Sequence, residues 1–82
     1  AAQSVYFVAD SDQGVVVKIL RDGKPLQAEA DDDIVKKGGM SSVFIKDARL
    51  YQLIDDPNGY GEHVLEMIVE KPGLRAFTFT FG

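Results

Sequence analysis

Hydrophobic and polar positions alternate along most of the chain with the two-residue period of a β-strand. The last stretch, residues 76–82, is the most regular, because Phe and Thr take turns there. This pattern predicts a terminal strand that lies in the core and closes the fold. Further segments rich in β-branched and aromatic residues are predicted as strands: 4–9, 15–20, 41–47, 49–55 and 63–70.

Turn signals separate these segments. The clearest is Asp22-Gly23, which fits the two positive φ values of a type I′ hairpin and places Arg21 opposite Lys24. Pro25 cannot donate to a ladder, so we expect a short edge strand after this turn. Residues 29–40 form the least regular stretch and predict a loop that contains a short strand or turn.

Register constrains the connection between the last two strands. A two-residue turn would set Glu66 opposite Phe79, which buries a charge or exposes a ring. A connection with an odd number of residues sets Met67 opposite Phe77 instead. We therefore predict a three- or five-residue connection centred on Pro72.

The sequence as a whole predicts an all-β fold. Six or seven short strands, frequent turn signals and no full-length amphipathic helix indicate a small antiparallel β-sandwich, of the jelly-roll or galactose-binding-like kind. The 82 residues suffice for one domain, 1–82. Since the chain enters an apolar stretch almost at once, we expect it to be the C-terminal fragment of a larger protein.

Composition excludes several function classes. The net charge of −4 disfavours nucleic-acid binding, which needs a basic face. No apolar run approaches the roughly 18 residues of a membrane helix, so we expect no direct membrane insertion. The chain has no Cys, which excludes disulfides and thiolate chemistry.

Few residues are candidates for catalysis or metal binding. His63 is the only His and shares a strand face with apolar residues, so we interpret it as structural. Carboxylates cluster in loops, where they could serve as acid and base of a glycosidase or as calcium ligands. We expect solvated turn residues, no catalytic residue and no cofactor; a structural calcium is the alternative, with Asp31, Asp33 and Asp55 as weak metal candidates.

The loop over residues 57–61 is the strongest candidate for binding. Tyr60 lies between two Gly, and an exposed Tyr offers a ring face for stacking on a sugar or a partner. Asn58 adds hydrogen-bond donors and acceptors. Tyr51 and Arg49 are the other two candidate binding residues. They share a strand face and could pair by cation–π stacking, for which a structural role in the sheet is the favoured interpretation.

Several segments carry a family resemblance: VYFVA, LRDGKPL, RLYQL, HVLEM and the ending PGLRAFTFTFG. They resemble the C-terminal, carbohydrate-binding-module-like domain of the DipZ family and of related thioredoxin-like proteins. Those proteins join a thiol–disulfide redox domain to a small β-sandwich. The resemblance implies an appended domain in an extracytoplasmic location, periplasmic or cell-envelope, with a thioredoxin-like domain upstream in cis. The redox Cys-x-x-Cys is absent from this chain, so the resemblance implies no redox activity here.

Two hypotheses about function follow. The first is a non-catalytic, carbohydrate-binding-like accessory module that recognises an envelope glycan or glycoprotein. The second is a structural or protein-interaction domain that packs on the redox domain or forms a homo-oligomer, because an unpaired strand edge is usually covered. Hydrolase activity ranks third, since nothing fixes the spacing of the carboxylates.

Overall fold

The computed structural model describes residues 3–9, 11, 13–57, 59, 61–70 and 75–81, the last stretch for its backbone and for the side chains of Phe77, Thr78 and Thr80. It contains eight strands: β1 (Gln3–Ala9), β2 (Val15–Arg21), β3 (Lys24–Pro25), β4 (Val35–Lys37), β5 (Met40–Ile45), β6 (Arg49–Asp56), β7 (His63–Glu70) and β8 (Arg75–Phe81). The described residues include no helix. The predicted all-β fold is therefore confirmed.

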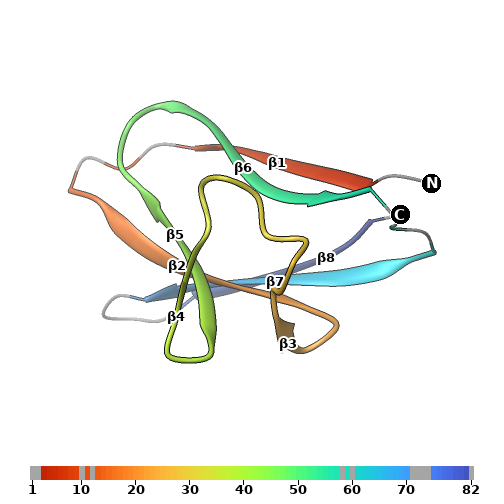
Figure 1. The fold of residues 1–82 in the computed structure, drawn as a ribbon. Helices are drawn as coiled ribbons and strands as arrows, with labels where there is room; N and C mark the ends of the chain where they lie inside the picture. The colour runs from red at the N-terminus through yellow and green to blue at the C-terminus, as the bar shows by residue number, and fades with distance from the viewer. Residues whose placement is uncertain are drawn as a thin grey trace.

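The strands form two antiparallel layers (Figure 1). One layer is the pair β1-β6. The other has six strands in the order β4-β5-β2-β7-β8, with β3 paired to β2. Strands β1 and β6 are far apart in sequence and meet along their whole length, from Gln3 opposite Asp56 to Ala9 opposite Arg49.

The core lies between the two layers. Alternate residues of each strand point into it, as the two-residue period requires. The buried apolar side chains are Val17, Ile19, Leu26, Val43, Ile45, Tyr51, Leu53, Ile54, Leu65 and Met67.

A β-bulge breaks the alternation in β6. Val5 pairs with Ile54, but the next residue of β1, Tyr6, pairs with Gln52, so Leu53 is the extra residue. Leu53 and Ile54 are adjacent in sequence, yet both are 0% exposed. The bulge thus adds a second consecutive apolar side chain of β6 to the core.

The hairpin predicted at Asp22-Gly23 is confirmed. Arg21 pairs with Lys24, and φ is 55° at Asp22 and 79° at Gly23, as a type I′ turn requires. The strand that follows is short, and Pro25 ends it. The side chain of Ser41 holds the chain beyond Pro25, because its hydroxyl accepts the Leu26 N–H at 2.8 Å.

The irregular stretch over residues 29–40 is also confirmed, with β4 as its short strand. Its first part lies along the second edge of β6: Ala30 bridges Ile54, and the Asp31 N–H donates to the Leu53 carbonyl at 3.0 Å. Its second part turns back into β5 through two Gly with positive φ. The loop therefore joins the two layers on this side of the molecule.

The register predicted for the last two strands is confirmed. Met67 pairs with Phe77, and Val69 pairs with Arg75, so the pairing is symmetrical about position 72. The connecting residues 71–74 lie outside the described part of the chain. The prediction that the final strand lies in the core is wrong, because β8 is at the end of the strand order and Phe77 is 53% exposed. An edge strand has a neighbour on one side only, which leaves the side chain of Phe77 partly uncovered.

Candidate functional site

Tyr51, one of the predicted binding residues, belongs to the core. It is 1% exposed, so its ring offers no face to a ligand. Its hydroxyl donates to the Asp47 carbonyl at 2.8 Å and accepts the Lys46 N–H at 3.0 Å. Both hydrogen bonds fix the loop between β5 and β6.

Arg49 covers the Tyr51 ring from outside. Its guanidinium lies 3.9 Å from the ring centroid, which confirms the predicted cation–π pair. It also donates to both oxygens of Asp33, at 2.9 and 3.2 Å, while the Gln52 N–H donates to Asp33 at 2.7 Å. The Arg49 hydrogen bond and then the Gln52 N–H lower the pKa of Asp33, and Asp33 raises the pKa of Arg49. The group ties the 29–34 loop to β6, as a structural role requires.

The acidic loops are engaged locally. Asp31 accepts its neighbour's N–H at 2.8 Å, and Asp33 is held by Arg49. Asp55 is exposed on β6. Across the part of the chain that the structure describes, no three His, Asp or Glu side chains gather as a metal-binding set. The structural calcium stays a prediction.

Asn58 and Tyr60, the two strongest predicted binding residues, lie outside the described residues. Pro57, at the start of their loop, lines a depression of about 380 Å³ together with Arg21, Glu29 and Asp56. This places one end of the predicted binding loop beside a charged cluster that sequence reasoning missed. The three charged residues are far apart in the chain, so no local motif could have signalled them.

The cluster is an ion triad. Arg21 binds Glu29 at 2.7 Å and Asp56 at 3.1 Å, and all three side chains are largely buried. Gln3 lies at the same end of the β1-β6 pair, where its amide nitrogen donates to the Gly61 carbonyl at 2.7 Å. Among the described side chains, the Gln3 Oε1 atom is buried without a hydrogen-bond partner.

His63 holds the β2-β3 turn. Its Nδ1 lies 2.6 Å from Asp22 Oδ2, and the Val64 N–H donates to Asp22 Oδ1 at 2.9 Å. The Val64 hydrogen bond, followed by the one from His63, lowers the pKa of Asp22. These contacts agree with the structural role predicted for His63.

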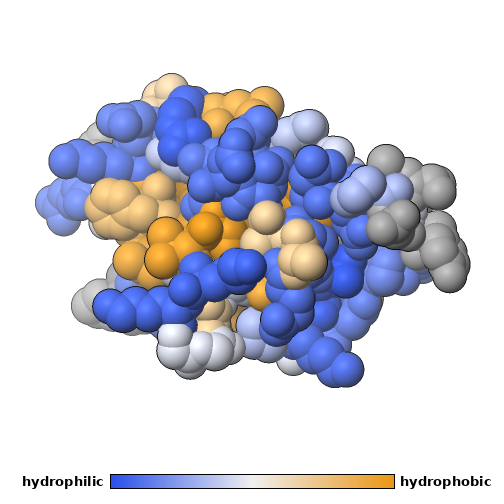
Figure 2. Space-filling model, viewed as in Figure 1, coloured by the Kyte–Doolittle hydropathy of each residue, from blue (hydrophilic) through white to orange (hydrophobic). Residues whose placement is uncertain are grey.

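The outer face of the β1-β6 pair carries exposed apolar side chains. Val8 is 75% exposed and lies opposite Leu50, and Tyr6 follows on the same face, opposite Gln52. Val8 and Leu50 line a shallow depression of about 500 Å³. Figure 2 shows an apolar group at the top of the view, over this layer. We call Tyr6, Val8 and Leu50 the outer apolar face.

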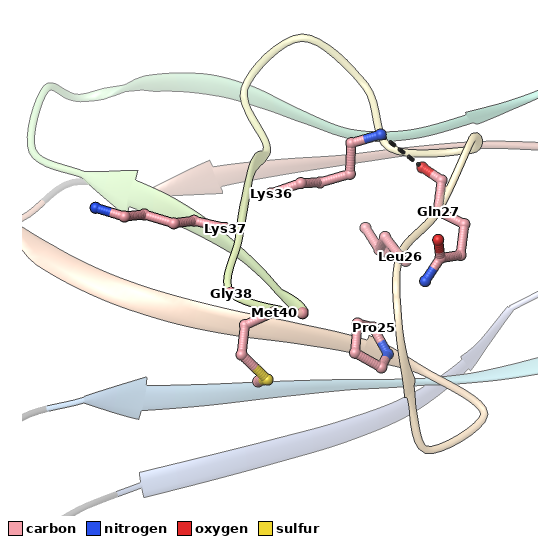
Figure 3. Close-up of a pocket in the computed structure, with 8 residues that line it drawn as sticks. Pro25, Leu26, Gln27, Lys36, Lys37, Gly38 and Met40 are labelled. Atoms are coloured by element: carbon pink, nitrogen blue, oxygen red, sulfur yellow. Dashed lines mark hydrogen bonds between the residues drawn. The ribbon is translucent and has the colours of Figure 1, made fainter.

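A third depression is small. It has a volume of about 170 Å³ and lies between the chain that leaves β3 and the β4-β5 turn. Figure 3 shows Lys36 reaching across it to the Gln27 carbonyl, at 3.5 Å, while Lys37 points away. Leu26 is buried beside it as part of the core, so we assign this depression no binding role.

Comparisons with known proteins place the chain in a family. The model of the thioredoxin-like C-terminal domain matches residues 1–82. Neither the curated proteins nor the solved structures give a significant match. The described residues form no helix long and apolar enough to cross a membrane.

The family match assigns the chain a supporting role. Its members are C-terminal domains of thioredoxin-like proteins, and this chain has no Cys with which to take part in thiol chemistry. Catalytic activity of its own is therefore not indicated. The whole of the chain belongs to the family of thioredoxin-like C-terminal domains.

Proposed function

We propose that this chain is a non-catalytic accessory domain that packs on the thioredoxin-like domain of the same protein. The observation that carries the proposal is the outer apolar face of Tyr6, Val8 and Leu50. Contiguous apolar surface on a small soluble domain marks a site of interaction.

The opposite face of the molecule is different in character. On the outer face of the six-stranded sheet, Lys18 and Glu70 form an ion pair at 2.7 Å, and Thr78 is exposed. Phe44 packs against Gly14 on this face but is still exposed, and Val16 and Val64 are exposed there too. What favours a partner for the β1-β6 layer is Val8, which at 75% is the most exposed large apolar side chain among the described residues.

The place of β1 in the chain favours a partner in cis. It is the first strand, so a domain joined upstream is tethered next to the outer apolar face. Tethering gives a high effective concentration, which makes a modest apolar face sufficient for docking. The proposal includes an extracytoplasmic location, supported by the resemblance to the DipZ family.

An NMR titration tests this proposal. The labelled domain is mixed with the separately produced thioredoxin-like domain of the same protein. We expect shifts at Tyr6, Val8 and Leu50, and we expect the Val8→Asp variant to bind at least tenfold more weakly. The control is Val35→Asp, because Val35 is 56% exposed but lies on β4. Equal binding by wild type and Val8→Asp would contradict the proposal.

Carbohydrate binding is the second candidate function. The observation that favours it is the depression where Pro57 meets Arg21, Glu29 and Asp56, because sugar hydroxyls hydrogen-bond well to such charged groups. Tyr60, three residues after Pro57 in the sequence, is the residue proposed to supply the stacking surface. An envelope glycan or glycoprotein is the partner that this reading proposes.

A separate titration with cell-wall oligosaccharides tests it. Shifts at Gln27 and Ala28, which line the same depression, would support sugar binding if Tyr60→Ala abolishes them. No shifts at millimolar sugar would reject it. The result does not bear on the outer apolar face, because the two sites involve different residues.

A further inference from the structure

Among the residues that the structure describes, the β1-β6 layer has one edge without a strand partner. The second edge of β6 is occupied by the 29–33 segment, through the Ala30–Ile54 bridge and the 2.9 Å hydrogen bond from the Asp55 N–H to the Glu29 carbonyl. For β1, β6 is the only strand partner among the described residues. Figure 1 shows β1 at the rim of its layer. Within the described part of the chain, the backbone groups of this layer without a strand partner therefore lie along β1.

The core is incompletely covered at this edge. Tyr51, on β6, is fully buried, whereas Phe7, its direct partner on β1, is only half-buried. Val5 and Ala9, the other inward residues of β1, are also half-buried, since they pack against the core without being enclosed by it. Another strand beside β1 would enclose them.

The edge of β1 lacks the features that normally prevent strand addition. Natural edges carry Lys, Pro or other charged residues that block pairing with another chain. Here β3 has Pro25 and β4 has Lys36 and Lys37. The sequence of β1, QSVYFVA, has no charged residue and no Pro. The bulge lies in β6, so the alternation of β1 is unbroken.

We propose that β1 pairs antiparallel with β1 of a second copy of this chain. A two-fold axis beside Tyr6 would set Tyr6 opposite Tyr6 of the second copy and Val5 opposite Phe7 of the second copy. The half-buried inward residues of both copies then cover one another. The two layers become one four-stranded sheet, in the order β6-β1-β1-β6. This inference goes beyond the proposed function, because the contact is backbone pairing along the edge of β1 and the partner is a second copy of this chain.

Charge favours a second copy at this edge over other parts of the surface. Two chains of net charge −4 repel each other, and an uncharged strand is where that repulsion is least. In the antiparallel dimer, the end of β6 that carries Arg49 in one copy lies on the same side of the sheet as the end of β6 that carries Asp56 in the other copy. On each side of the four-stranded sheet, Arg49 of one copy and Asp56 of the other are therefore the two outermost residues, so the facing charges are opposite and not alike.

Sedimentation of the chain over a range of concentrations tests the inference. We expect wild type to dimerise and Tyr6→Glu to be monomeric. At concentrations where wild type is also monomeric, the two chains should have the same melting temperature, because Tyr6 is on the outer face and its loss leaves the core intact. Tyr6→Lys alone should also be monomeric. Since the two-fold axis places position 6 against itself, an equimolar mixture of the Tyr6→Glu and Tyr6→Lys chains should dimerise again.

Two results would overturn the inference. One is a wild-type chain that stays monomeric at millimolar concentration. The other is a dimer that persists in Tyr6→Glu but dissociates in Thr78→Glu, which would assign the contact to the β8 edge, where Thr78 is exposed. Docking on the thioredoxin-like domain is measured with a different partner, so its failure and the failure of this inference are distinguishable.

Discussion

Asp33 shows how one carboxylate can join two parts of the fold. It accepts hydrogen bonds from the Arg49 guanidinium and from the Gln52 backbone, so the 29–34 loop is held against β6. The carboxylate accepts these bonds best when it is ionised. Its lowered pKa is the direct consequence, with Arg49 as the largest cause.

The stability contributed by Asp33 should therefore depend on pH. Because the folded pKa is below the unfolded value of about 3.9, the contribution is complete above that pH and is lost as pH falls through the folded pKa. We expect Asp33→Asn to lower the melting temperature at pH 7 and to matter progressively less as the medium becomes more acidic than about pH 4. Thermal melts of both chains across this pH window check the prediction. A constant difference at every pH would contradict it.

Gly14 is required for two reasons. Its φ of +83° is in the left-handed region, and a Cβ there would lie 2.4 Å from the Phe44 ring. We expect Gly14→Ala to cost about 1–3 kcal/mol of unfolding free energy, measured by urea denaturation. Gly38→Ala is the control, because Gly38 has φ +59° with nothing within 4 Å and reports the backbone cost alone.

A double variant separates the two terms at Gly14. In a Phe44→Ala background the ring is gone, so the excess cost of Gly14→Ala over Gly38→Ala should disappear. If the excess persists without the ring, close packing of Phe44 on Gly14 is not its cause.

At the scale of elements, Ser41 on β5 connects β2 to the segment that follows β3. Its hydroxyl is fully buried, accepts the Leu26 N–H and donates to the Ile19 carbonyl at 2.6 Å. We expect Ser41→Ala to cost about 1–3 kcal/mol of unfolding free energy, because the Leu26 N–H is left buried without an acceptor. Ser42→Ala, one residue further on β5 and on the opposite face, is the matched control and should be close to neutral. Equal losses in the two variants would be evidence against this role.

Most elements could be predicted from the sequence because their signals are local. Alternation located the strands, and Asp22-Gly23 located the hairpin. The pairing of β1 with β6 could not be predicted, since it joins residues about half the chain apart. The same holds for the edge position of β8, because an alternating Phe-Thr pattern is compatible with central and edge strands alike.

The candidate sites were less predictable than the fold. Alternation within residues 49–55 left open whether Tyr51 faces solvent or core, and only the second layer decides it. The Arg21 triad depends on three segments that meet only in the folded chain. The bulge in β6 sets the register between β6 and β1, and so decides which residues of the two strands share a face. No turn residue marks that bulge in the sequence.

At the scale of the whole molecule, the two layers differ in what they leave uncovered. The six-stranded sheet carries the Lys18–Glu70 ion pair on its outer face, together with the exposed apolar side chains of Val16, Phe44 and Val64. The β1-β6 pair has an apolar outer face and an uncharged edge. The exposed apolar side chains and the uncharged edge of the β1-β6 pair fit a domain that contacts other protein surfaces, which agrees with a C-terminal accessory domain of a thioredoxin-like protein.

Hydrogen exchange in the two-domain protein is the most direct test of the central claim, that the β1-β6 layer docks on the thioredoxin-like domain. Exchange is compared between the isolated chain and the same chain joined to its thioredoxin-like domain, at concentrations where both are monomeric. If the β1-β6 layer docks in this way, we expect slower exchange of the β1 and β6 amides in the joined protein and unchanged exchange in β4 and β5. Unchanged exchange in β1 and β6, or protection confined to β4 and β5, would contradict it.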